Sequence, residues 1–184
     1  MRPRLFLRIT TVIATTAMLA GCATLGVGSH TDRGLVWSKY KTFDWGPADA
    51  LPAGDPRLDK DPYFQDRVEG AIEKAMAAHG FVRSATTERP DVVIHYHANI
   101  AERFAADYVD DRHGYCAGDD CRSRVSRYEA GTLVVDIVDA ATNVLVWRGW
   151  ARGPIEGVLG NGDRMRRRID DSVSQMFETL APLR

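Results

Sequence analysis

Two stretches of the chain repeat their apolar side chains with the spacing of an amphipathic helix. The first begins after Asp61, a good N-cap residue, and ends at Gly80, which stands where a C′ glycine closes a helix. The second runs from Asp163 to about Ala181 and stops before Pro182. We therefore predict two helices, each with one apolar stripe that must be buried.

Four further stretches alternate apolar and polar residues with a period of two, which is typical of strands. They are residues 36–45, 91–104, 128–138 and 144–152, with a hairpin turn at 139–143 between the last two. The predicted order is β-α-β-β-β-α. Hairpin-joined strands are antiparallel, and two amphipathic helices need one sheet face against which to pack. The fold class is therefore expected to be α+β: a two-layer sandwich in which an antiparallel sheet of about four strands packs on two helices.

The chain opens with a basic and then apolar leader. Its basic part contains Arg2, Arg4 and Arg8, and residues 9–20 are apolar and uncharged. This run of about 12 residues is shorter than the roughly 20 that a membrane-spanning helix needs. It ends in Leu19-Ala20-Gly21-Cys22, which resembles the lipobox of bacterial lipoproteins.

A lipobox implies export, cleavage before Cys22 and acylation of that cysteine, palmitate included; an ordinary secretory signal or a short membrane anchor is the alternative. More than one acyl chain gives stable anchoring. Ala23 rather than aspartate follows, which in lipoprotein sorting favours the outer membrane over the inner. We expect residues 1–21 to be a signal peptide, residues 22–33 a flexible tether reaching at most about 35–40 Å, and residues 34–184 a single domain facing the periplasm.

Charge and length narrow the function classes. Cleavage would remove 21 of the 184 residues, three of them arginines, and leave 21 basic against 25 acidic residues, a net charge of −4. Nucleic-acid binding is disfavoured, because contacts to phosphates need a basic excess. The remaining length is enough for one domain with its own core.

The two cysteines of the predicted domain, Cys116 and Cys121, form an even pair in an oxidising compartment. They lie in a polar loop after the strand at 91–104. A disulfide closing this small ring would stabilise the fold by roughly 2 kcal/mol. There are three alternatives: a metal site formed by both thiols and His113, a redox-active pair, and two free thiols. The spacing of the cysteines is not the C-x-x-C that metal sites and redox-active pairs usually have.

A second group of side chains has the character of metal ligands. His95 and His97 are two residues apart on one predicted strand, so they point to the same side, and the strand at 128–138 is expected to bring Asp136 to that side. Two histidines and one carboxylate suit zinc or iron. The alternative is that these residues lie on the solvent-exposed face of an amphipathic strand, where every second residue is polar by necessity.

Four arginines lie in the first turns of the predicted last helix: Arg164, Arg166, Arg167 and Arg168. Each exposed cation there opposes the helix dipole by about 0.3–1 kcal/mol. This indicates a partner: anionic lipid headgroups, the acidic face of another protein, or the nearby Glu156, Asp170 and Asp171. The alternative is a solvated face whose charges are paired within the chain.

Four segments carry a family resemblance. They are Tyr40–Trp45, Pro90–His97, Gly131–Asp136 and the tryptophan-containing Leu145–Ala151, in that order. Over about residues 36–181 the chain resembles the bacterial lipoprotein family called domain of unknown function 4136. The resemblance implies a lipidated α+β domain with no assigned activity, so it supplies no catalytic residue. The Cys116–Cys121 loop does not match the shared pattern.

We expect a non-enzymatic binding or scaffolding protein of the envelope, without a cofactor, held to the membrane by Cys22 and contacting another envelope protein. The sequence contains no G-x-S-x-G elbow and no H-E-x-x-H helix. The alternatives are a metal-dependent hydrolase built on His95 and His97, and a small-ligand carrier with a groove between sheet and helices. An exposed tryptophan would favour the first function, and a deep apolar pocket the last.

Overall fold

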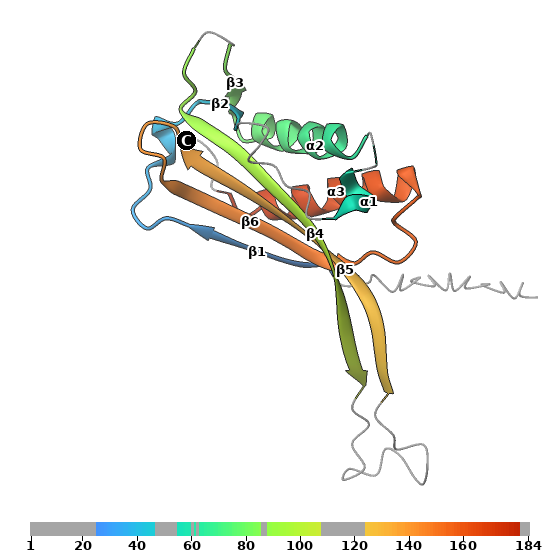
Figure 1. Cartoon of the computed structure of the whole chain (residues 1–184). Helices are drawn as coiled ribbons and strands as arrows, with labels where there is room; N and C mark the ends of the chain where they lie inside the picture. The colour runs from blue at the N-terminus through green and yellow to red at the C-terminus, as the bar shows by residue number, and fades with distance from the viewer. Residues whose placement is uncertain are drawn as a thin grey trace, which may run out of the picture.

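The computed structural model describes residues 25–46, 55–59, 61, 63–85, 88–107 and 124–180. A six-stranded mixed sheet carries two main helices on one face (Figure 1). The strands are β1 (Gly26–Thr31), β2 (Thr42–Trp45), β3 (Val82–Arg83), β4 (Val92–Asp107), β5 (Arg124–Asp139) and β6 (Leu145–Pro154). The helices are the 3-10 turn η1 (Trp37–Lys39), the short α1 (Pro56–Asp59) and the main helices α2 (Phe64–Ala78) and α3 (Gly162–Phe177). The predicted α+β class is confirmed.

The sheet order is β1-β6-β5-β4-β2-β3. Strands β1, β6, β5 and β4 pair with one another in antiparallel fashion, in that order. Strand β2 is parallel to both β4 and β3, so the prediction of a wholly antiparallel sheet is wrong. Asp91, just before β4, accepts hydrogen bonds from the backbone N–H groups of Lys41 and Thr42 at 2.8 and 2.9 Å, which places the starts of β2 and β4 side by side. Helix α2 is the crossover that such a parallel pair requires.

Strand β1 occupies part of the predicted tether. All six of its residues pair with β6, from Gly26 opposite Arg152 to Thr31 opposite Trp147. Only Val27 and the preceding Leu25 pack against the core, so this edge strand has too few apolar residues for its sequence to stand out. The prediction of a flexible tether is therefore corrected for Gly26–Thr31, and residues 22–24 lie outside the described part of the chain.

The predicted strand at 36–45 is interrupted by a turn. Trp37 and Tyr40 are both buried, and their ring centroids lie 6.0 Å apart in an edge-on contact. Two side chains three residues apart face the same side of a helical turn but opposite sides of a strand. Burial of both rings therefore favours η1, and the strand begins only at Thr42.

The two main helices form where the sequence predicts them, but Asp61 is not the N-cap of α2, and α3 ends at Phe177 rather than at about residue 181. The Asp61 carboxylate accepts from the N–H of Tyr63, which is the N-cap of α2, at 3.0 Å, and Gly80 ends the helix with a φ of 91°. In α3 the cap is Asn161 rather than Asp163: its side chain accepts from the N–H of Arg164 at 3.0 Å. Within the described residues no helix is long and apolar enough to cross a membrane.

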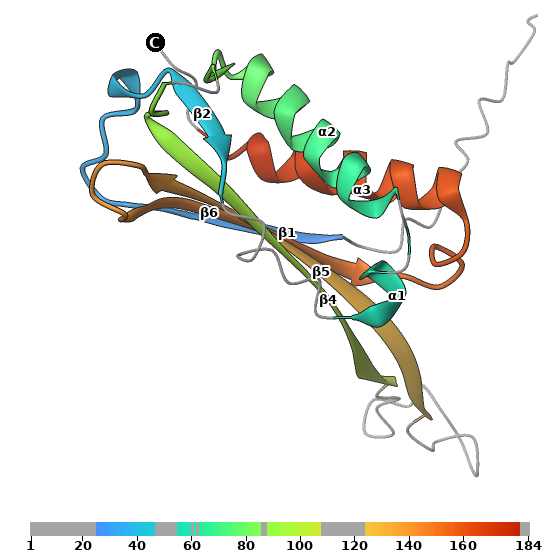
Figure 2. The ribbon, with the colours of Figure 1, turned by 45° about the horizontal axis from the view of Figure 1, so that its top comes forward.

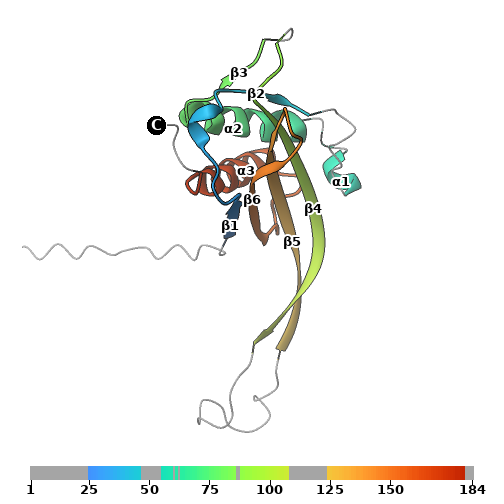
Figure 3. The same cartoon turned by 90° about the vertical axis from the view of Figure 1, so that its left-hand side faces the viewer.

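The core lies between the helices and the inner face of the sheet (Figure 2). Val92, Ile94, Tyr96 and Ala98 of β4 are buried there, as the alternation predicts. Trp147 of β6 is fully buried, and its ring lies 5.1 Å from that of Phe177 at the end of α3. Strands β4 and β5 continue beyond the rest of the sheet as a two-stranded arm (Figure 3).

A buried carboxylate joins the β5–β6 hairpin to the N-terminal part of the domain. Asp139 accepts from the backbone N–H groups of Ala141 and Thr142 at 2.9 and 3.0 Å, from the Tyr40 hydroxyl at 2.8 Å and from Lys39 Nζ at 3.2 Å. These hydrogen bonds, that of Thr142 foremost, hold the pKa of Asp139 far below its ordinary value. The folded state therefore favours the charged form of this carboxylate.

Candidate functional site

The sheet face turned away from the helices, called here the outer face, carries His95, His97 and Asp136, the three metal ligands that the sequence predicts. Register places its residues in rows across β1, β6, β5 and β4. The three rows are His30–Arg148–Asp136–His95, Gly28–Trp150–Val134–His97 and Gly26–Arg152–Thr132–Asn99.

The first row contains two of the three predicted metal ligands. His95 lies directly opposite Asp136, as expected. Arg148 lies opposite Asp136 on the other side, and its Nε and Nη2 each donate to a carboxylate oxygen at 2.6 Å. Both oxygens of the buried Asp136 carboxylate therefore accept a hydrogen bond from Arg148. Among the described residues no three histidine, cysteine or acidic side chains form a cluster that fits a metal ion.

His95, His97 and Asp136 share one face but form no three-ligand cluster among the described residues, so the metal site stays a prediction. The sequence placed all three on one face correctly, but it did not show that the register would bring Arg148 to Asp136. The His95 ring also packs over the end of β2, because a Cβ on Gly46 would lie only 2.1 Å from its Cε1 atom. A packing role explains this histidine.

In the second row, the side chain of an exposed tryptophan packs on a glycine. Trp150 keeps 39% of its surface accessible, whereas Trp147, three residues earlier on the same strand, is fully buried. The indole lies over Gly28 of β1: a Cβ on Gly28 would be 2.4 Å from the Trp150 Cζ2 atom. Glycine at this position lets the ring lie flat across the edge strand, which fixes its orientation.

Arginines border this indole on a hollowed part of the outer face. Arg148 and Arg152 flank Trp150 along β6. Two adjacent hollows, of about 500 and 380 Å³, share Gly26, Arg103 and Arg152 in their linings, and the larger also includes Trp150. Sites for small ligands usually have about 300–1,000 Å³. Among the residues that the structure describes, no carboxylate lies within ion-pair distance of Arg103 or Arg152.

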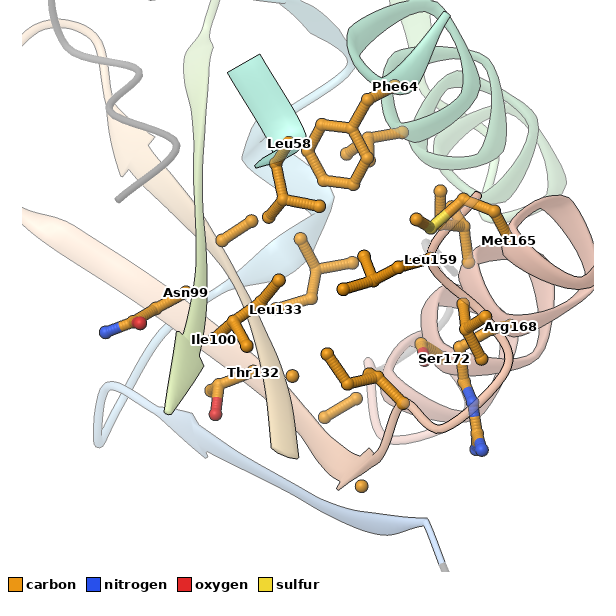
Figure 4. Close-up of a pocket in the computed structure, with 18 of the residues that line it drawn as sticks. Leu58, Phe64, Asn99, Ile100, Thr132, Leu133, Leu159, Met165, Arg168 and Ser172 are labelled. Carbon is orange, nitrogen blue, oxygen red and sulfur yellow. The ribbon is translucent and has the colours of Figure 1, made fainter. Parts of the chain in front are cut away.

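An apolar cavity lies on the other side of the sheet, between its inner face and the helices (Figure 4). Leu58, Phe64, Leu133 and Met165 point into it, and the polar ends of Asn99, Thr132 and Arg168 point away. Its volume is about 70 Å³, little more than two water molecules occupy in the liquid. A lipid or cofactor needs several times that space, so this cavity does not support the small-ligand carrier that we considered.

The arginines of α3 find few acidic partners. Arg166 Nη2 lies 3.9 Å from Asp163 Oδ1, a long contact between exposed groups. Arg164 and Arg168 donate instead to the backbone carbonyls of Gly157 and Pro154, at 3.3 and 3.0 Å. In the described part of the chain none of the four arginines pairs with Glu156, Asp170 or Asp171. Internal ion pairing therefore does not explain the cluster.

Three residues of the predicted sites lie outside the described part of the chain. They are the acylation site Cys22 and the two cysteines Cys116 and Cys121, so lipidation and the disulfide stay predictions. Conversely, the sequence did not point to Arg103, to Arg152 or to the packing of Trp150 on Gly28. A usable signal existed for Arg152, because Arg148, Trp150 and Arg152 occupy alternate positions and must share one face of a strand.

A family model described as "Domain of unknown function (DUF4136)" matches residues 27–180. The chain belongs to this family. The match confirms the resemblance to DUF4136, and it extends into β1, a segment that the sequence predicts to be part of the tether. No curated protein matches the chain.

Three solved structures are similar to this chain at low sequence identity. A DUF4136 family protein from Bacteroides thetaiotaomicron has a TM-score of 0.52 and 16% identity, over 86% of this chain and 97% of that one. A PDZ domain protein from Parabacteroides distasonis has a TM-score of 0.49 and 13% identity over 83% of this chain, which spans only 35% of that protein. The PelC dodecamer from Paraburkholderia phytofirmans has a TM-score of 0.48 and 12% identity, over 83% and 95% of the two chains.

Proposed function

We propose that this DUF4136 protein is anchored by an acylated Cys22 to the periplasmic face of the outer membrane, and that it is a non-enzymatic module that binds another envelope protein. The anchor rests on the leader and on the lipobox that ends at Cys22. The binding role rests on one observation above all, the exposed indole of Trp150 held on Gly28 beside the arginine-lined hollow.

Trp150 has the properties of an interface anchor. Tryptophan and arginine are the residues most enriched where a few side chains carry the binding energy. Because Gly28 already fixes the orientation of the indole, little side-chain freedom remains to be lost on binding.

A charge pair at the centre of the outer face supports the binding role. Its buried carboxylate, Asp136, is neutralised by Arg148 at 2.6 Å and accepts both of its hydrogen bonds from it. This bidentate pair fixes the Arg148 side chain in the row next to that of Trp150.

Site-specific photo-crosslinking in cells tests the binding role. A photoreactive residue in place of Asn99, an exposed position in the row beside Trp150, is expected to give one discrete adduct with an envelope protein. Trp150→Ala should lower the adduct yield at least about tenfold, as for a hot-spot residue. Gly28→Ala should do the same with the indole intact, because the new methyl group displaces the ring.

The control probe takes the place of Lys74, an exposed residue of α2 on the opposite layer. It should give no such adduct. An adduct at Asn99 that survives both Trp150→Ala and Gly28→Ala, or that forms equally at Lys74, would contradict binding through the outer face.

Metabolic labelling with a palmitate analogue tests the anchor. We expect the wild-type protein to carry the label and to be smaller than its precursor by residues 1–21. Cys22→Ala should be unlabelled and keep its leader, because the lipobox cysteine is the acylation site. Equal labelling of the two proteins, read by in-gel fluorescence, would rule out acylation at Cys22.

A further inference from the structure

The described chain begins very close to the predicted anchor. Leu25 is only three residues after Cys22, and three extended residues span at most about 11 Å. The sequence predicts a tether of about 11 residues with a reach of at most about 35–40 Å. Because β1 starts at Gly26, the actual reach between Cys22 and the domain is much shorter. An acylated Cys22 would therefore hold this corner of the domain at the membrane surface.

Arginines from two elements surround the point where the chain leaves the domain. Arg152 of β6 is the register partner of Gly26. Arg168 of α3 reaches the same corner from the helix layer: a Cβ on Gly153 would lie 3.3 Å from Leu25 Cδ1 and 3.7 Å from Arg168 Nη1. Figure 2 shows the starts of β1 and α3 at the same end of the sandwich. Arg164 lies one turn before Arg168.

We call Arg152, Arg164 and Arg168 the basic corner. Arg164 and Arg168 each donate to one backbone carbonyl, and a guanidinium has five N–H donors. Among the described residues no carboxylate lies within ion-pair distance of the three. Their remaining donors are free to bind an anion, and guanidinium groups match the geometry of phosphate oxygens.

We propose that the basic corner docks the domain on the phosphates of anionic phospholipid headgroups, in the membrane that holds Cys22. The proposal deepens the proposed function and rests on its anchor. One feature selects a membrane as the occupant: the described chain begins among these arginines, three residues after the predicted acylation site, so their positive charge would lie at the anionic surface. The hollow beside Trp150 includes Arg152, so the bound partner would lie next to the bilayer.

Vesicle co-sedimentation tests the docking separately from the anchor. The processed chain with Cys22→Ser, which has no acyl group, is mixed with phosphatidylethanolamine vesicles that contain or lack phosphatidylglycerol. We expect binding only to the anionic vesicles, weakening as salt is added. Replacing Arg152, Arg164 and Arg168 together by glutamine should lower the partition coefficient at least tenfold.

A matched control removes the same charge elsewhere. Arg33, Lys41 and Lys74 are exposed residues away from this corner, and their joint replacement by glutamine should leave binding within about twofold of the wild type. Thermal unfolding of both triple variants verifies that they fold. Equal loss in the two variants, or equal binding to vesicles without phosphatidylglycerol, would overturn the proposal. Failure of palmitate labelling at Cys22 would instead overturn the anchor and leave the vesicle result standing.

Discussion

Asp139→Ala is expected to lower the free energy of unfolding by about 3 kcal/mol. The substitution removes the acceptor of four hydrogen bonds and leaves the buried Tyr40 hydroxyl without a partner. It also frees the backbone N–H groups that shape the β5–β6 turn. Urea denaturation followed by circular dichroism measures the loss. Asp32→Ala, at an exposed aspartate with no side-chain hydrogen bond among the described residues, is the control and should change stability by less than about 0.5 kcal/mol.

The same carboxylate gives the domain a defined acid dependence. The pKa of Asp139 is lowered in the folded state from an ordinary value near 3.8, so the unfolded chain takes up the proton first as pH falls. The stabilisation is complete above about pH 4 and is lost as pH falls through the folded pKa. Asp139→Asn should therefore flatten this acid limb, although Asp55 and Asp91, whose pKa values are also lowered, keep part of it. An unchanged acid limb in Asp139→Asn would contradict this account.

Gly149→Ala is expected to destabilise the domain by about 2–3 kcal/mol, although it adds a single methyl group. The new Cβ would lie 2.3 Å from Cη2 of Trp147, and that ring is fully buried against Phe177. A well-packed core has no space into which the indole can turn, so backbone or ring must shift. The measurement is again urea denaturation.

Gly70→Ala is the matched control, because the same methyl group has no neighbour within 4 Å there. Gly70 is exposed in the middle of α2, where alanine is the better helix former. This variant should therefore gain about 0.5–1 kcal/mol. A Gly149→Ala protein as stable as Gly70→Ala would show that the core around Trp147 is loosely packed.

Much of the fold could be predicted because it depends on residues close together in the sequence. The alternation that buries Val92, Ile94 and Tyr96 is a two-residue period, and the glycine that ends α2 acts on the turn just before it. The α+β class follows from such local periods alone. Even the placement of His95 and Asp136 on one face needed only the alternation within each strand.

What the sequence by itself determined was therefore the identity of the main helices and strands, and the side of each strand that is buried. The tertiary structure decided which strands are neighbours and in what register, since those pairings join residues far apart in the chain. Register alone brought Arg148 to Asp136 and Trp150 to Gly28. The pairing of Gly26 with Arg152 likewise turned the predicted tether into an edge strand and placed its start among arginines. A one-dimensional pattern carries no signal for such contacts, because each partner satisfies its own local period equally well in another register.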